Sequence, residues 1–92
     1  MVNLADIAGA GTVVQFQAIN ATARWIQIIV SGTGTVRLGT PPTLSAAEGL
    51  PIAAGSGMFF PWSGQLSCYN LSQFWAYVPI GATVSVAYEP FN

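Results

Sequence analysis

The sequence predicts an all-β protein, a small antiparallel β-sandwich or barrel of jelly-roll-like form with about six to eight short strands. Three observations lead to this fold class. Ten glycines and six prolines interrupt the 92-residue chain at short intervals. The segments between them are rich in Val, Ile, Thr and aromatic residues, which favour strands. Their side chains alternate between two faces, and no segment has a convincing helical period.

Two segments in the first third of the chain predict the first strands. In Thr12–Ala18, Phe16 and its alternate neighbours lie on one face and two glutamines on the other. Thr22–Ser31 is the longest candidate, and its residues expected to face the core are Ile26, Ile28 and Val30.

The most convincing predicted hairpin joins Thr22–Ser31 to the next strand, Thr35–Gly39. The connection Ser31–Gly34 reads Ser-Gly-Thr-Gly, and short glycine-rich connections are typical of hairpins. In the second strand, Val36 and Leu38 are expected to face inward.

Proline and glycine also divide the second half of the chain. The Pro-Pro pair at 41–42 ends the pairing because proline cannot donate to a ladder. Leu44–Gly49 is either one helical turn or a loop, and Leu50–Gly55 leads into the next strand. Further strands are expected at Gly57–Trp62, Leu66–Asn70, Gln73–Val78 and Thr83–Glu89. The predicted core consists of Ile26, Ile28, Val30, Val36, Leu38, Phe74, Val78, Val84 and Val86.

Residues 1–11 lack the alternation of a strand, so we predict an N-terminal arm before a single β-sandwich domain at 12–92. The arm is apolar and rich in Gly and Ala, with Asp6 as its one charged residue. Two alternatives are open. The segment is a frayed terminus, or it lies on a neighbouring subunit, which would hide Leu4 and Ile7.

The scarcity of charge favours an assembled protein. Hydrophobic residues make up 52% of the chain and charged residues only 5%, with a net charge of −1. A folded chain of this mass exposes roughly 5,000 Å², so each charge serves about 1,000 Å². Single domains that depend on surface charge for their solubility normally carry several times as many charged residues. We therefore expect other protein chains to cover much of the surface. The alternative is a monomer that its Ser, Thr, Gln and Asn side chains keep soluble.

Nucleic acid and membranes are not expected as partners. Arg24 and Arg37 are the only cations, too few for binding driven by phosphate contacts. No window supplies the ~20 apolar residues of a spanning helix, and no signal peptide is visible.

Catalytic chemistry is not expected because the necessary groups are missing. No His or Lys is present to activate a serine. Cys68 is the only cysteine, which excludes a multi-thiolate zinc site, and its apolar neighbours favour a buried thiol. Asp6, Glu48 and Glu89 lie on separate segments, so nothing suggests a catalytic carboxylate pair. We predict no enzymatic activity, no cofactor and no metal.

The apolar residues left over after the core is filled point to an interface. Exposed aromatic patches usually mark interfaces, and Trp and Tyr are enriched among binding hot spots. The alternative is that these aromatic residues form a second hydrophobic layer under the proline-rich loops. Together with the two arm residues, the candidate interface residues are Leu4, Ile7, Trp25, Ile29, Phe59, Trp75 and Tyr77.

Four stretches of the chain, over about residues 12–89, resemble the small β-sandwich structural proteins of tailed-phage virions. They are residues 23–28 (ARWIQI), 34–39 (GTVRLG), 48–55 (EGLPIAAG) and 81–89 (GATVSVAYE). The resemblance implies a capsid decoration, or cement, protein on the phage head surface, assembled in the cytoplasm of the bacterial host. It also implies a homo-oligomer, commonly a trimer, that binds the major capsid protein, and it transfers no catalytic residue.

Two other functions remain as alternatives. One is a structural subunit associated with the tail, baseplate or fibre of the virion. The other is a carbohydrate-binding module with Trp62, Trp75 and Tyr77 as stacking platforms. Sugar sites usually add convergent hydrogen-bonding groups, and the sequence has few near these aromatic residues.

Overall fold

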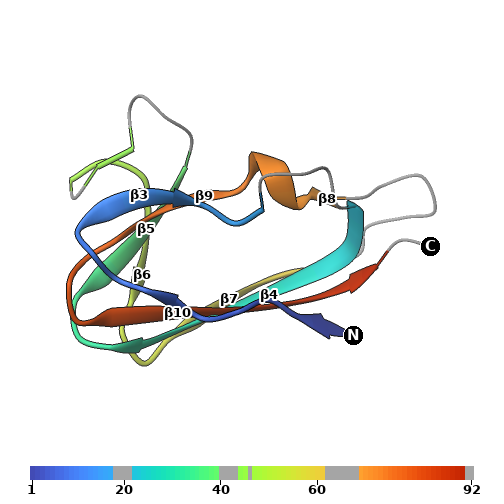
Figure 1. Cartoon of the computed structure of the whole chain (residues 1–92), viewed down its shortest axis with the longest axis horizontal. Coiled ribbons are helices and arrows are strands. Elements are labelled where there is room, and N and C mark those ends of the chain that lie inside the picture. The colour runs from blue at the N-terminus through green and yellow to red at the C-terminus, as the bar shows by residue number, and fades with distance from the viewer. Residues whose placement is uncertain (18–21, 40–43, 46, 62–68, 91–92) are drawn as a thin grey trace.

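Alternating side chains build two antiparallel sheets that pack face to face (Figure 1). The computed structural model describes residues 1–17, 22–39, 44–45, 47–61 and 69–90. In these residues there are ten strands, one short 3₁₀ helix and no α-helix. The all-β sandwich predicted from the sequence is therefore confirmed, and the barrel alternative is wrong because the strands divide between two sheets.

The large sheet has the strand order β1–β10–β4–β7, with β2 also paired to β10 and β8 to β4. Strand β4, predicted almost to its ends, lies at its centre between β10 and β7. The bounds of its strands are β1 Val2–Asn3, β2 Ile7–Ala8, β4 Thr22–Gly32, β7 Gly57–Phe60, β8 Tyr69–Asn70 and β10 Ala82–Pro90.

The small sheet has the order β3–β9–β5–β6. Its strands are β3 Thr12–Gln15, β5 Thr35–Gly39, β6 Leu50–Ala53 and β9 Trp75–Val78. The 3₁₀ helix η1, Leu71–Gln73, precedes β9, and the side chain of Asn70 caps it by accepting a hydrogen bond from the backbone N–H of Ser72.

The order of pairing is that of a jelly roll. Along the chain, β1 pairs with β10, β3 with β9, β4 with β7 and β5 with β6. These nested pairs correspond to one long hairpin that is wrapped so that alternate pairs fall in opposite sheets. β1 and β2 contain only two residues each, which is too short for a sequence pattern, and neither was predicted. β6 was expected only as a lead-in to the next strand, whereas the two-residue β8 lies within the predicted segment Leu66–Asn70.

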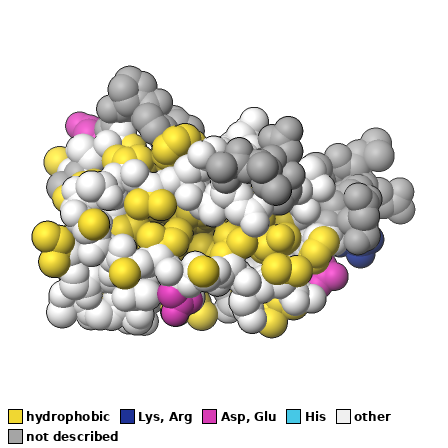
Figure 2. All heavy atoms as spheres, in the orientation of Figure 1, with side chains coloured by type: hydrophobic (Ala, Val, Ile, Leu, Met, Phe, Trp, Pro, Cys, Tyr) yellow, Lys and Arg dark blue, Asp and Glu magenta, His cyan; other side chains and the backbone are white. Residues whose placement is uncertain are grey.

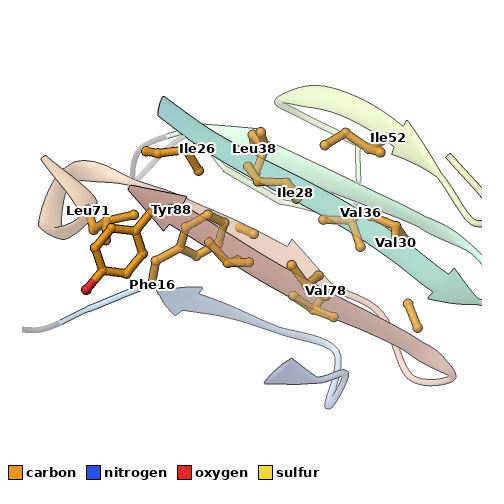
Figure 3. Packing of buried hydrophobic residues seen from close by; sticks show 14 of the residues in the cluster. Phe16, Ile26, Ile28, Val30, Val36, Leu38, Ile52, Leu71, Val78 and Tyr88 are labelled. Atoms are coloured by element: carbon orange, nitrogen blue, oxygen red, sulfur yellow. The ribbon is translucent and has the colours of Figure 1, made fainter. Parts of the chain in front are cut away.

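The core lies between the sheets, and it contains the residues that alternation predicted. Side chains from both sheets meet there, including Ile28 of β4 and Leu38 of β5 (Figure 3). Phe74 is partly buried against the core. The other predicted core residues are all buried, namely Ile26, Ile28, Val30, Val36, Leu38, Val78, Val84 and Val86.

The predicted hairpin between Thr22–Ser31 and Thr35–Gly39 is wrong. These segments form β4 and β5, which belong to different sheets. β10 and β7 occupy the two edges of β4, so β5 has no edge on which to pair. Gly32 and Gly34, with φ values of +90° and +93°, instead turn the chain from one sheet to the other.

The N-terminal segment is part of the sandwich and not a separate arm. Val2 pairs with Tyr88, and Ile7 pairs with Val84, both on β10 of the same chain. Between these strands, the N–H of Leu4 donates to the carbonyl of Val86 (2.9 Å). The segment therefore forms the edge of the large sheet, which corrects the prediction that it lacks strands.

Four tight turns, at residues 9–11, 32–34, 54–56 and 79–81, lie together at one end of the sandwich, on the left in Figure 1; we call this the turn end. Backbone hydrogen bonds join one turn to another. The N–H of Thr33 donates to Gly81 (3.0 Å), and the N–H of Ala54 donates to Gly34 (3.0 Å). The turn end is thus a single network of interlocked backbone.

Replacement of Gly32 by alanine tests this interlocking. A Cβ there would overlap the carbonyl oxygen of Gly81, whereas a Cβ at Gly55 meets nothing within 4 Å, although both glycines have positive φ. We expect Gly55→Ala to cost about 1 kcal/mol in free energy of unfolding, for the left-handed backbone alone. Gly32→Ala should cost more than about 3 kcal/mol, because the neighbouring turn must also shift. Urea unfolding measures both values, and equal costs would contradict the interlocked turn end.

Candidate interaction surfaces

The described residues contain no catalytic grouping. No group of three His, Cys, Asp or Glu side chains comes together among them, and their buried residues are all apolar. Cys68 and Trp62 lie outside the described residues. The predictions of no enzyme, cofactor or metal remain predictions.

The few charged groups make contacts of their own at the surface. The N-terminal amine lies 3.1 Å from a carboxylate oxygen of Glu89. The Ser85 hydroxyl donates to Asp6 (3.0 Å), and the Arg37 guanidinium donates to the carbonyl of Gly49 (3.1 Å). The accessible surface is 5129 Å², close to the area expected from the mass, so charge is as sparse as the sequence indicated.

Three of the predicted interface residues come together on the outer face of the large sheet. Trp25 and Ile29 point outward from β4, because their neighbours Ile26 and Ile28 are fully buried. The Phe59 ring on β7 lies 5.7 Å from the Trp25 ring, centroid to centroid, at an angle of 41°. Ile29 is 47% exposed and Phe59 is 55% exposed. We call Trp25, Ile29 and Phe59 the large-sheet patch.

Trp75 and Tyr77 lie on the opposite side of the sandwich, on the outer face of the small sheet. Both alternate along β9 with the buried residues Ala76 and Val78, so they point outward. Tyr77 pairs with Val13 of β3 on one side and with Arg37 of β5 on the other. Aromatic and Arg side chains are the types enriched at interfaces. We call Val13, Arg37, Trp75 and Tyr77 the small-sheet patch.

Leu4 and Ile7 lie apart from both patches, on the N-terminal segment of the large sheet. Both are partly buried against the core of their own chain. Apolar side chains fill a band between the two sheets along the edge where β1, β2 and β3 lie (Figure 2). Their own chain already covers part of Leu4 and Ile7, and their place in an interface stays a prediction.

Three other aromatic residues form a cluster of ring contacts inside the sandwich. Phe60 and Phe74 meet edge to face with ring centroids 5.3 Å apart, and Tyr69 contacts both rings. Trp75 borders a hollow of about 290 Å³ together with Phe60 and Phe74. None of these three rings belongs to the candidate interface residues, so the second-layer alternative stays a prediction, and Phe59 of the large-sheet patch is mostly exposed.

The most exposed large apolar residue in the described chain is Ile80, which sequence reasoning missed. Its side chain is 79% exposed at the turn between β9 and β10. A signal was present, because an isoleucine in the turn sequence Pro-Ile-Gly stands where polar residues and glycine are usual.

No family model matches the chain, and no curated protein or solved structure was found to be similar to it. Within the described residues, no helix has the length and apolar character needed to cross a membrane. The fold and the two patches therefore carry the functional argument.

The ring contact in the large-sheet patch is testable by a double-mutant cycle. We expect Trp25→Ala and Phe59→Ala to show a coupling energy of about 0.5–1.5 kcal/mol, the usual range for aromatic pairs. Trp25→Ala with Tyr77→Ala is the matched control, because these residues lie on opposite faces and their effects should add within about 0.5 kcal/mol. Urea unfolding of monomeric protein gives the free energies. Strict additivity in the first pair would contradict the contact.

Proposed function

We propose that this protein is a non-enzymatic structural protein of a tailed-phage virion, a decoration (cement) protein that binds major capsid subunits on the head surface. The observation that carries the proposal is the pair of aromatic patches on opposite outer faces of a charge-poor sandwich. A binding protein for one small ligand needs one site. A protein with aromatic patches on two opposite faces is suited to bind two neighbouring subunits at once.

The geometry of the two patches supports a clamp. The large-sheet patch and the small-sheet patch are separated by the packed core, so a neighbour on one face leaves the other face free. The large-sheet patch consists of uncharged aromatic and aliphatic side chains, and the small-sheet patch adds one charge, Arg37, whose guanidinium donates to the carbonyl of Gly49. Removing such a surface from water requires little desolvation of charge, whereas burying unpaired charge is costly.

The energetics are sufficient for a cement role. Burial of a few hundred Å² of apolar surface contributes several kcal/mol at ~25 cal/mol per Å², before the costs of association. Repetition over a symmetric shell multiplies weak contacts through avidity. The interlocked turn end limits the conformational entropy that docking would remove.

The jelly-roll topology agrees with this proposal by analogy only. Two-sheet jelly rolls occur in viral capsid proteins, but also in lectin domains, and a fold does not determine a function. The carbohydrate-binding alternative is weaker. Trp75 and Tyr77 lie on one strand, but the nearest cross-strand side chains are Val13, Gln15 and Arg37, of which Gln15 and Arg37 donate hydrogen bonds to backbone carbonyls within the chain.

Localisation on the particle tests the proposed role. Virions of the phage that encodes the protein are labelled with an antibody against it and imaged by electron microscopy. We expect label over the head surface. Label confined to the tail, baseplate or fibres would support the other structural role instead. A glycan array with strong binding that Tyr77→Ala abolishes would favour the carbohydrate module.

Substitutions in each patch test the clamp. Ile29→Ser with Phe59→Ser on one face, and Tyr77→Ser on the other, should each weaken binding to purified heads at least tenfold, because each removes exposed apolar contact area. Ser31→Ala, at the exposed end of β4, is the matched control and should bind like the native protein. Co-sedimentation with heads measures the affinity, and thermal unfolding checks the fold. Unchanged binding by both patch variants would exclude these contact surfaces.

A further inference from the structure

The apolar side chain of Ile80 projects from the surface and does not pack in the core. It occupies a central position of the turn closed by the hydrogen bond from the Ala82 N–H to the Pro79 carbonyl (3.1 Å). Gly81 follows it with a φ of +96°. Such a turn sets no requirement for an isoleucine at that position, and 79% of the side chain is exposed.

The turn end holds this projection rigidly and contains no charge. Residues 9–11, 32–34, 54–56 and 79–81 include no Asp, Glu, Lys or Arg. The Thr33 N–H and the Gly9 N–H donate to the carbonyls of Gly81 and Ala82 (3.0 and 2.8 Å), so the Ile80 turn is fixed by two neighbouring turns. A partner would therefore meet a preorganised, uncharged surface.

A hollow of about 360 Å³ lies on the outer face of the large sheet. It exists because β10 presents small outward side chains, Ser85 and Ala87, between larger neighbours. Ile29 of β4 flanks it on one side, and Met1 and Asn3 of the N-terminal segment flank it on the other.

We propose that the Ile80 turn of one copy inserts into this hollow of a second copy. The inference rests on the proposed decoration protein being a homo-oligomer, as the resemblance to virion proteins implies, and it names the contact that would join its copies. Ile80 would displace water from the apolar wall formed by Ile29 and Ala87. At the rim, the Asp6 carboxylate, which accepts from Ser85, would also accept from the central N–H groups of the incoming turn. The turn end brings no charge of its own, so the charges beside the contact are those of the receiving copy: Asp6, and the N-terminal amine of Met1 with its partner Glu89.

The second copy is the occupant that the observations favour. The projection and the hollow are on the same chain, at different places, and they match in apolar character and in hydrogen-bonding groups. Such a head-to-tail contact is heterologous: it makes a ring, such as the expected trimer, when the rotation closes. The contact uses Ile29 of the large-sheet patch, and it leaves Trp25, Phe59 and the small-sheet patch free for the capsid.

Complementation between two variants tests this contact. Ile80→Ser removes the projection but keeps the hollow, and Ala87→Leu fills the hollow but keeps the projection. We expect each variant alone to show a dissociation constant for self-association at least tenfold higher than the native value. An equimolar mixture should form a one-to-one heterodimer that grows no further, because only one projection and one hollow remain. Sedimentation velocity distinguishes these species.

Controls separate the possible failures. Ser56→Ala, in a neighbouring turn of the same end, should associate like the native protein. Asn3→Leu is a second way to block the hollow if Ala87→Leu does not fold. If the native protein associates and both variants associate equally well, or if the mixture restores nothing, this contact is wrong while the proposed function stands. A native protein that is monomeric at millimolar concentration and binds no phage particle overturns the proposed function as well.

Discussion

The stability of the fold depends on the hydrophobic core between β4 and β10 of the large sheet and β5 and β9 of the small sheet. Val and Ile side chains fill this core, and full burial of each contributes about 1.5–3 kcal/mol relative to exposure. The core takes side chains from only one face of each strand. Because the chain is 52% hydrophobic, apolar side chains remain for the other faces as well. The exposed Phe59 and Ile29 are thus a surplus that folding does not explain, and this surplus is the physical basis of our proposal that the protein binds other subunits.

Alternation along single strands could be predicted from the sequence, but the partners of those strands could not. Ile26, Ile28 and Val30 were assigned inward correctly, because side-chain direction is a local property of a strand. The hairpin between β4 and β5 was wrong because Gly-Thr-Gly permits a sharp turn without specifying whether the chain stays in its sheet. The N-terminal strands were missed because two residues are too few for alternation, and their pairing comes from β10, some eighty residues away.

The same distinction holds for the candidate surfaces. That Trp25 and Phe59 point outward follows from their strands, whereas their ring contact follows from the register of β4 with β7, which the sequence does not encode locally. Leu4 and Ile7 were assigned to an interface because no strand was expected to cover them. Ile80 went unnoticed because alternation says nothing about turns. The direction of a side chain on its own strand could therefore be predicted, whereas contacts between side chains of different strands could not.

The nesting of the strand pairs also has a consequence for how the chain acquires its structure. Val2 pairs with Tyr88, so the first strand of the chain completes its hydrogen bonds only on the last one. Contacts between residues so distant in sequence slow folding, since a long loop must close before any of them forms. During synthesis, β1 and β2 must wait for β10 to leave the ribosome. Newly made chains therefore pass through a stage with open strand edges, when premature association is the main hazard.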